Sequence, residues 1–547
     1  MYLAKIDIQG FKGIKHLVLN LNKDSSILIG ENRWGRSSLI SAFMLLSLDN
    51  LFYQFSESDF FYDEKQRADM ANIRFIFSEN SENELQLEHY LPLNAVSYQE
   101  SNPTKPVICY KIHASRKTNK IITEHYFTDI NDNKIEINNT KQLIELLIML
   151  NPVMSLKNPI NKDDLPINNQ PLSNYYVEQL STQLASHSQQ FSPHDLEKGL
   201  VAVRALIEYY LVGKNERYHY KNIAKKTTPT NEEWSSLERI NDLLDEINND
   251  YIRVILMGVF SAIIIAKGNN QLLPHAVPIL ILEEPESQLH PIILSVGFRL
   301  LKNFPTQKFI TTNSSDLVSL FSLEHIYHLI RGPSGIIAMH VEEDSISTAD
   351  RRKILFHILY RRASAIFARC WLLVEGETEI WLLRELAEQS GFHLSSEGVQ
   401  LIEFAQCGLK PLISYANKMG IQWYVLTDGD VAGKKYSSTA QSLIPKGCEV
   451  NDYLTVLPAR DIENFLFKHG FSHVYKLAGY GSTAHIDLPV NRIIHKAIQK
   501  NSKPDLAIAI CDDAKKRGNQ AIPSLLKQTF FNVVKLAKTS NQNICSK

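Results

Sequence analysis

Two pairs of acidic residues in the last third of the chain each follow an apolar run that is typical of a buried strand. Glu375 follows CWLLV, and Glu379 lies four residues later, the spacing of side chains on one helical face. Asp428 and Asp430 follow QWYVLT and flank Gly429, so their side chains project to the same side of the chain. Hard carboxylate oxygens that converge in this way suit Mg²⁺ or Mn²⁺. Two such ions could activate water and stabilise the leaving oxygen of a phosphodiester.

Each acidic pair also has a simpler interpretation. A DGD string alone is more typical of a polar turn or a calcium loop, and EGETE alone is typical of a helix start with acidic residues on the helix dipole. Both strings occur here in order, each after an apolar strand pattern. That order favours one shared metal site over two unrelated turns.

A glycine-containing segment near the N-terminus, GENRWGRS (30–37), follows the strand pattern SSILI and precedes a helical pattern. This is the context of a phosphate-binding P-loop, G-x-x-x-x-G-K-[ST], with Arg36 in place of the lysine. Backbone N–H groups of such a loop bind phosphate oxygens, and Ser37 would bind Mg²⁺ beside them. Arginine keeps the charge but is a wide planar fork where a compact ammonium normally fits. The nucleotide-binding residues expected here are Gly30, Glu31, Asn32, Gly35, Arg36, Ser37 and Ser38.

A second carboxylate strand supports the P-loop interpretation. The string PILILEEPESQLHP (278–291) is an apolar strand that ends in Glu283 and Glu284. We expect Glu283 to hold Mg²⁺ and Glu284 to orient or activate the attacking water, as in phosphoryl transfer.

The composition is that of an ordinary soluble chain with room for several domains. Its 547 residues are 44% hydrophobic and 21% charged, with a formal net charge of −1, which excludes a largely disordered chain. From Asn491 to Lys547, eleven Lys/Arg against three Asp give +8, a modest hint of phosphate contact. The six cysteines lack zinc-ligand spacing, the N-terminus lacks a signal peptide, and the longest apolar run, 254–266, is too short to span a bilayer. We therefore expect a cytoplasmic protein that makes no membrane contact.

Strand and helix patterns alternate in the parts of the chain that carry these motifs, which predicts an α/β fold. Strands are expected over 2–11, 25–30, 277–282 and 370–374, and a helix after the P-loop. The suggested organisation is an N-terminal part of a P-loop head (1–90), a largely helical insertion (91–250), a C-terminal part of the head (251–365) and an α/β domain (366–547).

The P-loop, the LEEPE…LHP string and the opening IDIQGFKGI (6–14) together resemble the ATPase heads of RecF, SMC and ABC-type proteins. The resemblance implies ATP as the ligand and places Lys12 near the nucleotide base. No LSGG-like signature precedes the second carboxylate strand, and Asn313, in KFITTNSSD, stands where such heads carry a switch histidine. With Arg36, these departures argue against fast hydrolysis more than against nucleotide binding.

The two acidic strings resemble the Toprim domain of topoisomerases, primases and certain nucleases. Little chain remains for the tyrosine-bearing cleavage domain of a topoisomerase, and the zinc-binding or helicase-docking module of a primase is not visible. A RecF/SMC-like head followed by a Toprim domain is similar to the OLD (overcoming lysogenisation defect) family of ATP-dependent endonucleases. Strings such as LIGENRWGRSSL, ARCWLLVEGETE and DGDVAGKKY resemble its YbjD-type members most. The similarity runs nearly end to end and is weakest across 90–230.

The OLD resemblance implies specific roles for residues of the last third. It implies that the Toprim carboxylates bind metal, that Glu463 in ARDIENFL is a further acidic ligand, and that Lys503 in NSKPDLA stabilises charge on the scissile phosphate. It also implies DNA as the substrate, a homodimer, and a dimerisation arm within 91–250. The implied metal ligands of the nuclease site are Glu375, Glu379, Asp428, Asp430 and Glu463.

The leading hypothesis is therefore a homodimeric, ATP-binding, Mg²⁺- or Mn²⁺-dependent DNA endonuclease in phage defence or DNA repair. The alternative is a nucleotide-dependent DNA clamp or scaffold with a silent nuclease site. The departures in the head favour this alternative, and the complete carboxylate set opposes it. A transporter ATPase has little support, because no signature or membrane-docking feature is evident.

Overall fold

The computed structural model describes most of the chain outside a long central segment. The described residues are 1–31, 35–63, 66–99, 105–117, 120–155, 276–287, 295, 298, 299, 302, 306–332, 335–343, 345–482 and 488–539. The predicted dimerisation arm lies outside them from residue 156 onward, and so does Asn32. Two compact units are present, the first comprising Met1–Phe321 with His325–Leu329 and Ser334–Ala338, and the second the remaining residues up to Lys547.

An antiparallel sheet begins the first unit. Its strand order is β2 (Ile14–Asn20), β1 (Tyr2–Phe11), β6 (Met70–Ser78), β8 (Pro106–Lys117) and β7 (Ser97–Gln99), and β9 (Lys120–Thr128) pairs with β8. Strand β2 places Ile14, Leu17 and Leu19 in the core and exposes the residues between them. This alternation is typical of an antiparallel sheet with one solvated face.

A second sheet in the first unit carries the predicted nucleotide motifs. Its order is β10 (Val153–Ser155), β11 (Ile279–Glu283), β12 (Gln307–Thr311), β3 (Ser25–Ile29), β13 (Ile326–Gly332) and β14 (Gly335–His340). The strands from β10 to β13 pair in parallel, and β3 and β12 are buried along their whole length. Helix α1 (Arg36–Phe43) follows β3, α2 (Thr140–Leu150) precedes β10, and α8 (Ser315–Val318) follows β12.

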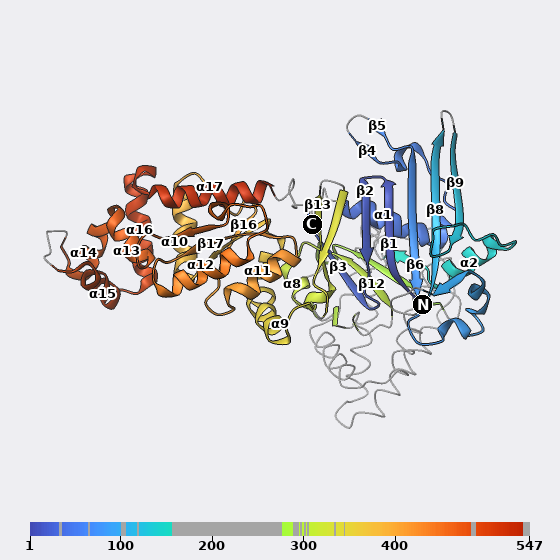
Figure 1. The fold of residues 1–547 in the computed structure, drawn as a ribbon, viewed down its shortest axis with the longest axis horizontal. Coiled ribbons are helices and arrows are strands. Elements are labelled where there is room, and N and C mark those ends of the chain that lie inside the picture. Colours follow the sequence, from blue (N-terminus) through green and yellow to red (C-terminus); the bar gives the residue numbers. More distant parts are fainter. Residues whose placement is uncertain are drawn as a thin grey trace, which may run out of the picture. The chain divides into compact units, whose positions relative to one another are not determined.

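The second unit is built on a four-stranded parallel sheet (Figure 1). Its order is β16 (Val399–Glu403), β15 (Cys370–Val374), β17 (Gln422–Thr427) and β18 (Leu454–Val456). All five residues of β15 are buried, as expected for a central parallel strand covered on both faces. Its helices are α10 (Glu377–Gln389), α11 (Leu409–Lys418), α12 (Val431–Leu443), α13 (Ile462–Leu466), α14 (Ser472–Tyr480), α15 (Val490–Lys500), α16 (Lys503–Arg517) and α17 (Ser524–Thr539).

The segment that leads into β15 carries a buried charge network. Helix α9 (Thr348–Ile354) continues into a π-helical turn, Leu355–Tyr360. His357 Nε2 lies 2.7 Å from the backbone oxygen of Glu403, at the end of β16, and Arg362 forms an ion pair with the Glu403 carboxylate. Because Glu403 is paired with Val374 across the sheet, this network supports the strand end that precedes Glu375.

The four strands expected over 2–11, 25–30, 277–282 and 370–374 are confirmed, as is the helix after the P-loop. None of the helices in the described part of the chain is long and apolar enough to cross a membrane.

Candidate functional site

The carboxylate strings of the second unit follow two neighbouring strands. Strands β15 and β17 pair in parallel, so their carboxyl ends lie at the same edge of the sheet. Glu375 comes directly after β15, and Asp428 comes directly after β17. The fold therefore brings the two predicted acidic pairs to one edge.

The first acidic pair lies at the turn from β15 into α10. Glu379 is in the first turn of α10, and its Oε2 accepts a hydrogen bond from the backbone N–H of Glu375 at 3.1 Å. The pKa of Glu379 is raised to about 8, first by burial and then by the charge of Asp428. Burial also raises the pKa of Glu375, with a smaller contribution from Asp430. The Oε2 atom of Glu375 is buried and has no hydrogen-bond partner within the described residues.

The second acidic pair is held by a close backbone approach and by a helix cap. The Gly429 N–H donates to the backbone oxygen of Ala459 at 2.9 Å, and a Cβ at position 429 would lie 2.4 Å from that oxygen. Asp430 is the N-cap of α12, where its Oδ1 accepts a hydrogen bond from the Gly433 N–H at 2.7 Å. The DGD string is thus both a tight turn and a helix start, and it presents Asp428 beside the first pair.

Asp428 lies at the centre of the negative charge. The pKa of Asp428 is raised to about 7, first by burial and then by the charges of Glu375, Asp461, Glu463 and Asp430. These groups come from the ends of β15 and β17 and from the start of α13. The shift shows that acidic side chains from three parts of the chain share one electrostatic environment.

Glu463 and Lys503 form an ion pair beside these carboxylates. Lys503 Nζ lies 2.7 Å from Glu463 Oε1. Ser502 caps α16 by accepting a hydrogen bond from the Asp505 N–H, which makes Lys503 the first residue of that helix. Burial lowers the pKa of Lys503, but the hydrogen bond and charge of Glu463 outweigh it, and the net pKa is raised. Lys503 therefore stays charged next to the acidic cluster.

Asp461 and Tyr475 belong to this region and were not predicted from the sequence. Asp461 caps α13 through a hydrogen bond from the Asn464 N–H to its Oδ1 at 2.7 Å. The signal for Asp461 was present, since Asp before an apolar helix start is a typical N-cap. Tyr475 lies in a helix with no motif, so nothing in its local sequence marked it.

The carboxylate oxygens of the acidic edge are of the type that binds a hard divalent cation. In their present positions, the side chains do not enclose one. Within the described residues, no group of three or more His, Cys, Asp or Glu side chains is close enough to hold a metal ion as it stands. The carboxylate oxygens are nonetheless of the type that Mg²⁺ and Mn²⁺ prefer. Burial and mutual repulsion raise the pKa values of Glu375, Glu379 and Asp428, and Glu375 keeps a buried oxygen without a partner within the described residues. A bound cation would relieve both the repulsion and the unpaired oxygen.

The P-loop segment of the first unit lies between β3 and α1, as predicted. Gly30 and Gly35 have φ angles of 145° and 81°, which favour glycine. A Cβ on Gly30 would lie 2.7 Å from the backbone oxygen of Leu329, and one on Gly35 would lie 2.4 Å from Ile336 Cδ1. Both glycines are therefore needed for the path of the loop.

Arg36 joins three motifs of the first unit. Its buried guanidinium donates to Asn313 Oδ1 at 2.9 Å, to the Thr312 backbone oxygen at 3.2 Å and to Glu284 Oε1 at 3.1 Å. Burial lowers the pKa of Arg36, and the charge of Glu284 opposes this shift. Glu284 follows Glu283, the last residue of β11, and has a φ of 43°, a strained value for a residue with a side chain. The P-loop cation thus contacts the carboxylate expected to act on water.

The other predicted nucleotide-binding residues surround the same loop. Lys12 Nζ lies 3.8 Å from Asp59 Oδ1, so its charge is directed toward that carboxylate. Ser38 Oγ accepts a hydrogen bond at 3.1 Å from a backbone N–H of the turn between β1 and β2. Ser37 is the second residue of α1, and Glu31 follows Gly30 at the start of the loop.

Two family models match consecutive parts of the chain. Residues 1–365 match "Protein of unknown function (DUF2813)", and residues 366–430 match "Overcoming lysogenization defect protein-like, TOPRIM domain". The chain is similar over nearly its whole length to the uncharacterized protein YbjD of Escherichia coli (strain K12). The two are 37% identical over 551 residues, which cover 98% of this chain and 99% of YbjD. The predicted OLD-type Toprim domain and the YbjD-type resemblance are confirmed.

Solved structures resemble the two parts of the chain. The C-terminal region of the Burkholderia pseudomallei OLD protein is 20% identical, with a TM-score of 0.27, and covers 31% of this chain and 99% of its own. The SMC head domain from Thermotoga maritima is 12% identical, with a TM-score of 0.31, and covers 62% of this chain and 100% of its own. The predicted α/β class is confirmed by the parallel strands in both units. The first unit carries the P-loop and the LEEPE carboxylate strand, and the second carries the Toprim strings.

Proposed function

The chain belongs to the DUF2813 family and contains an OLD-like Toprim domain, and from this premise we propose that it is an ATP-binding, divalent-metal-dependent DNA endonuclease. One observation carries the proposal. The Toprim acidic pairs meet at the carboxyl edge of the sheet in the second unit, where burial and mutual repulsion raise the pKa of Asp428 to about 7 and that of Glu379 to about 8. Shifts of this kind are concentrated at functional sites.

In this proposal, the acidic edge binds Mg²⁺ or Mn²⁺. Glu375, Glu379, Asp428 and Asp430 would hold the metal, with Glu463 as a further ligand. When bound, the metal lowers the pKa of water and offsets the charge that develops on the phosphodiester oxygens. Asp430 and Gly429 keep the acidic turn rigid through the helix cap and the hydrogen bond to the neighbouring loop.

We assign Lys503 to the scissile phosphate. Its ammonium already lies within the acidic cluster, 2.7 Å from Glu463 Oε1. From this position the ammonium of Lys503 would stabilise negative charge on the phosphate. The ion pair with Glu463 therefore keeps the Lys503 ammonium charged and in position before substrate binds.

The head is proposed to bind ATP and Mg²⁺ and to regulate assembly on DNA. Ser37 and Glu283 would hold the Mg²⁺, and Glu284 would orient water. Before ATP can use Arg36, the guanidinium must leave Glu284 and Asn313. This competition fits a slow ATPase that acts as a switch. We also propose that the protein is a cytoplasmic homodimer in phage defence or DNA repair.

The test is nicking of supercoiled plasmid by the full chain in Mg²⁺ and in Mn²⁺, with and without ATP. Wild type is compared with Glu375→Ala and with Asp452→Ala, an exposed acid of the same unit that pairs with Lys535. We expect wild type and Asp452→Ala to nick DNA in a metal-dependent way and Glu375→Ala to lose the activity. Full activity in folded Glu375→Ala would refute the assignment of the metal site.

A second candidate function is a nucleotide-dependent DNA clamp with a silent nuclease site. The hydrogen bonds of Arg36 to Glu284 and Asn313 favour the clamp, because they hold the P-loop cation away from a bound phosphate. Retention on DNA–cellulose without cleavage in either metal would support the clamp and contradict the nuclease.

A further inference from the structure

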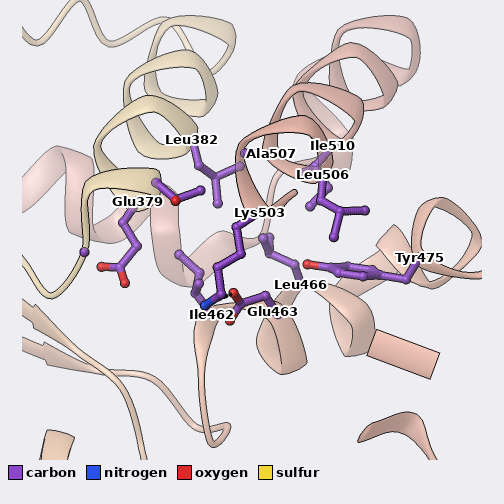
Figure 2. Close-up of a pocket in the computed structure, with 12 residues that line it drawn as sticks. Glu379, Leu382, Ile462, Glu463, Leu466, Tyr475, Lys503, Leu506, Ala507 and Ile510 are labelled. Carbon is purple, nitrogen blue, oxygen red and sulfur yellow. Dashed lines mark ion pairs between the residues drawn. The ribbon is translucent and has the colours of Figure 1, made fainter. Parts of the chain in front are cut away.

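A cavity opens directly beside the acidic edge of the second unit. Its volume is about 160 Å³, and it lies between α10, α13, α14 and α16 (Figure 2). Glu379, Glu463 and Lys503 line one part of it. A molecule in the cavity would therefore touch the residues that we place around the scissile phosphate.

The remaining walls of the cavity are apolar. They are supplied mainly by branched aliphatic side chains that are almost entirely buried, so these inner walls belong to the core of the unit. A cavity of about 150 Å³ with aliphatic walls has room for a ring the size of benzene. The principal apolar lining residues are Leu382, Ile462, Leu466, Leu506, Ala507 and Ile510.

One polar group is directed into this apolar space. Tyr475 is 1% exposed, and its hydroxyl points into the cavity between Leu466 and Leu506 (Figure 2). Within the described residues, this hydroxyl makes no hydrogen bond, and it faces the accessible space of the cavity. A hydroxyl that faces a cavity and has no protein partner there can bond to an atom of a ligand.

From this geometry we infer that the cavity binds the base of an unpaired nucleotide next to the cut. The inference rests on the proposed nuclease function and names its substrate class. A flat heterocycle suits the size and apolar walls of the cavity, and its ring nitrogens or carbonyl oxygens suit the Tyr475 hydroxyl. A base can enter such a cavity only when it leaves the stack, which costs least where it is already unpaired. The preferred substrates are therefore single strands, bulges or other DNA with an extruded nucleotide.

The test compares labelled oligonucleotides of one sequence, cleaved by the full chain in Mn²⁺. The substrates are a perfect duplex, a duplex with one unpaired nucleotide, and the same bulge with an abasic residue in place of that nucleotide. We expect the bulge to be cut at least about tenfold faster than the other two, since its unpaired base needs no unstacking from a duplex and buries apolar surface that the abasic residue lacks. Equal rates on the bulge and its abasic form would overturn the inference and leave the nuclease proposal intact.

Two variants connect that preference to the cavity. Ala507→Leu fills the space, and we expect it to lose the bulge preference while it still nicks the duplex. Ile508→Leu is the control, because Ile508 is on the same helix but half exposed and outside the lining. Tyr475→Phe removes only the hydroxyl, so it tests the inference even if Ala507→Leu fails to fold. Unchanged preference in folded Ala507→Leu, or in Tyr475→Phe, would overturn the assignment.

A binding readout separates this inference from cleavage. In Ca²⁺, a bulge that carries 2-aminopurine is titrated with the protein, and its fluorescence should rise as the base leaves the stack. A fluorescence rise in wild type that Ala507→Leu abolishes supports base binding in the cavity. If no substrate is cut in the same experiments, only the nuclease proposal is contradicted. Tight DNA binding without a rise overturns the inference alone. Absence of DNA binding overturns both.

Discussion

The turn that carries the second acidic pair has room only for glycine at position 429. A Cβ added there would lie 2.4 Å from the backbone oxygen of Ala459 and 2.5 Å from that of Leu457. Real Cβ atoms are essentially never closer than 3.0 Å to such an atom, so Gly429→Ala must push the two segments apart by at least about half an ångström. Both neighbours are backbone atoms and cannot rotate away.

The expected cost of Gly429→Ala follows from this displacement. The hydrogen bond from the Gly429 N–H to Ala459 is weakened, which costs about 1 kcal/mol, and overpacking adds about 1–3 kcal/mol. The free energy of unfolding should fall by about 2–4 kcal/mol, or roughly 5–10 °C in Tm. Asp428 and Asp430 flank the displaced residue, and a shift approaching 1 Å in catalytic groups costs up to about 100-fold in rate.

The assay is plasmid nicking in Mn²⁺ beside a thermal melt of the same samples. Gly447→Ala is the control, since its φ is also unfavourable for alanine, at 88°, but no atom lies within 4 Å of the added Cβ. We expect the control to lose about 1 kcal/mol and to nick DNA at the wild-type rate. Gly429→Ala that nicks within twofold of this control would refute the reasoning about the turn.

The charges of the second unit lead to three more expected outcomes. The pKa of Asp428 rises from 3.8 to about 7 on folding, so the metal-free protein should lose stability as pH rises from about 4 to about 7. Thermal melts of Asp428→Asn should show a flatter pH dependence than those of wild type. Equal slopes for the two proteins would contradict this expectation. Lys503→Gln should cut DNA about 100- to 1,000-fold more slowly in single-turnover assays, with little change in Tm, and a wild-type rate would exclude its role at the phosphate. Arg362→Ala should lower the free energy of unfolding by about 3 kcal/mol in urea titrations, because it leaves the buried Glu403 carboxylate without its cation. The control Arg361→Ala, which removes only an exposed hydrogen bond, should cost less than about 0.5 kcal/mol, and equal losses would argue against the buried pair.

The elements and loops of both sites were predictable because their signals are local. Apolar runs that end in carboxylates marked β11, β15 and β17, and the parallel sheets then placed those carboxylates at strand ends. Gly30 and Gly35 marked the P-loop for the same reason, since a turn of this kind needs positive φ.

The pairings between distant segments were not predictable from local pattern. Lys503 was suggested only by family resemblance, and its ion pair with Glu463 spans forty residues. The engagement of Arg36 by Glu284 likewise joins positions about 250 residues apart. Tyr475 lies in a helix without a motif, and only the packing of α14 against α16 gives its hydroxyl a role. Such contacts depend on tertiary structure, which no spacing rule encodes.

The central claim is that the acidic edge of the second unit binds the metal that cuts DNA. The most direct test is Mn²⁺ binding by electron paramagnetic resonance, measured in the same samples that are assayed for plasmid nicking. We predict that wild type binds Mn²⁺ and nicks DNA with one shared metal dependence, and that folded Asp428→Ala loses both together. Undiminished nicking by Asp428→Ala, or nicking by wild type at metal concentrations where this site stays empty, would contradict the account.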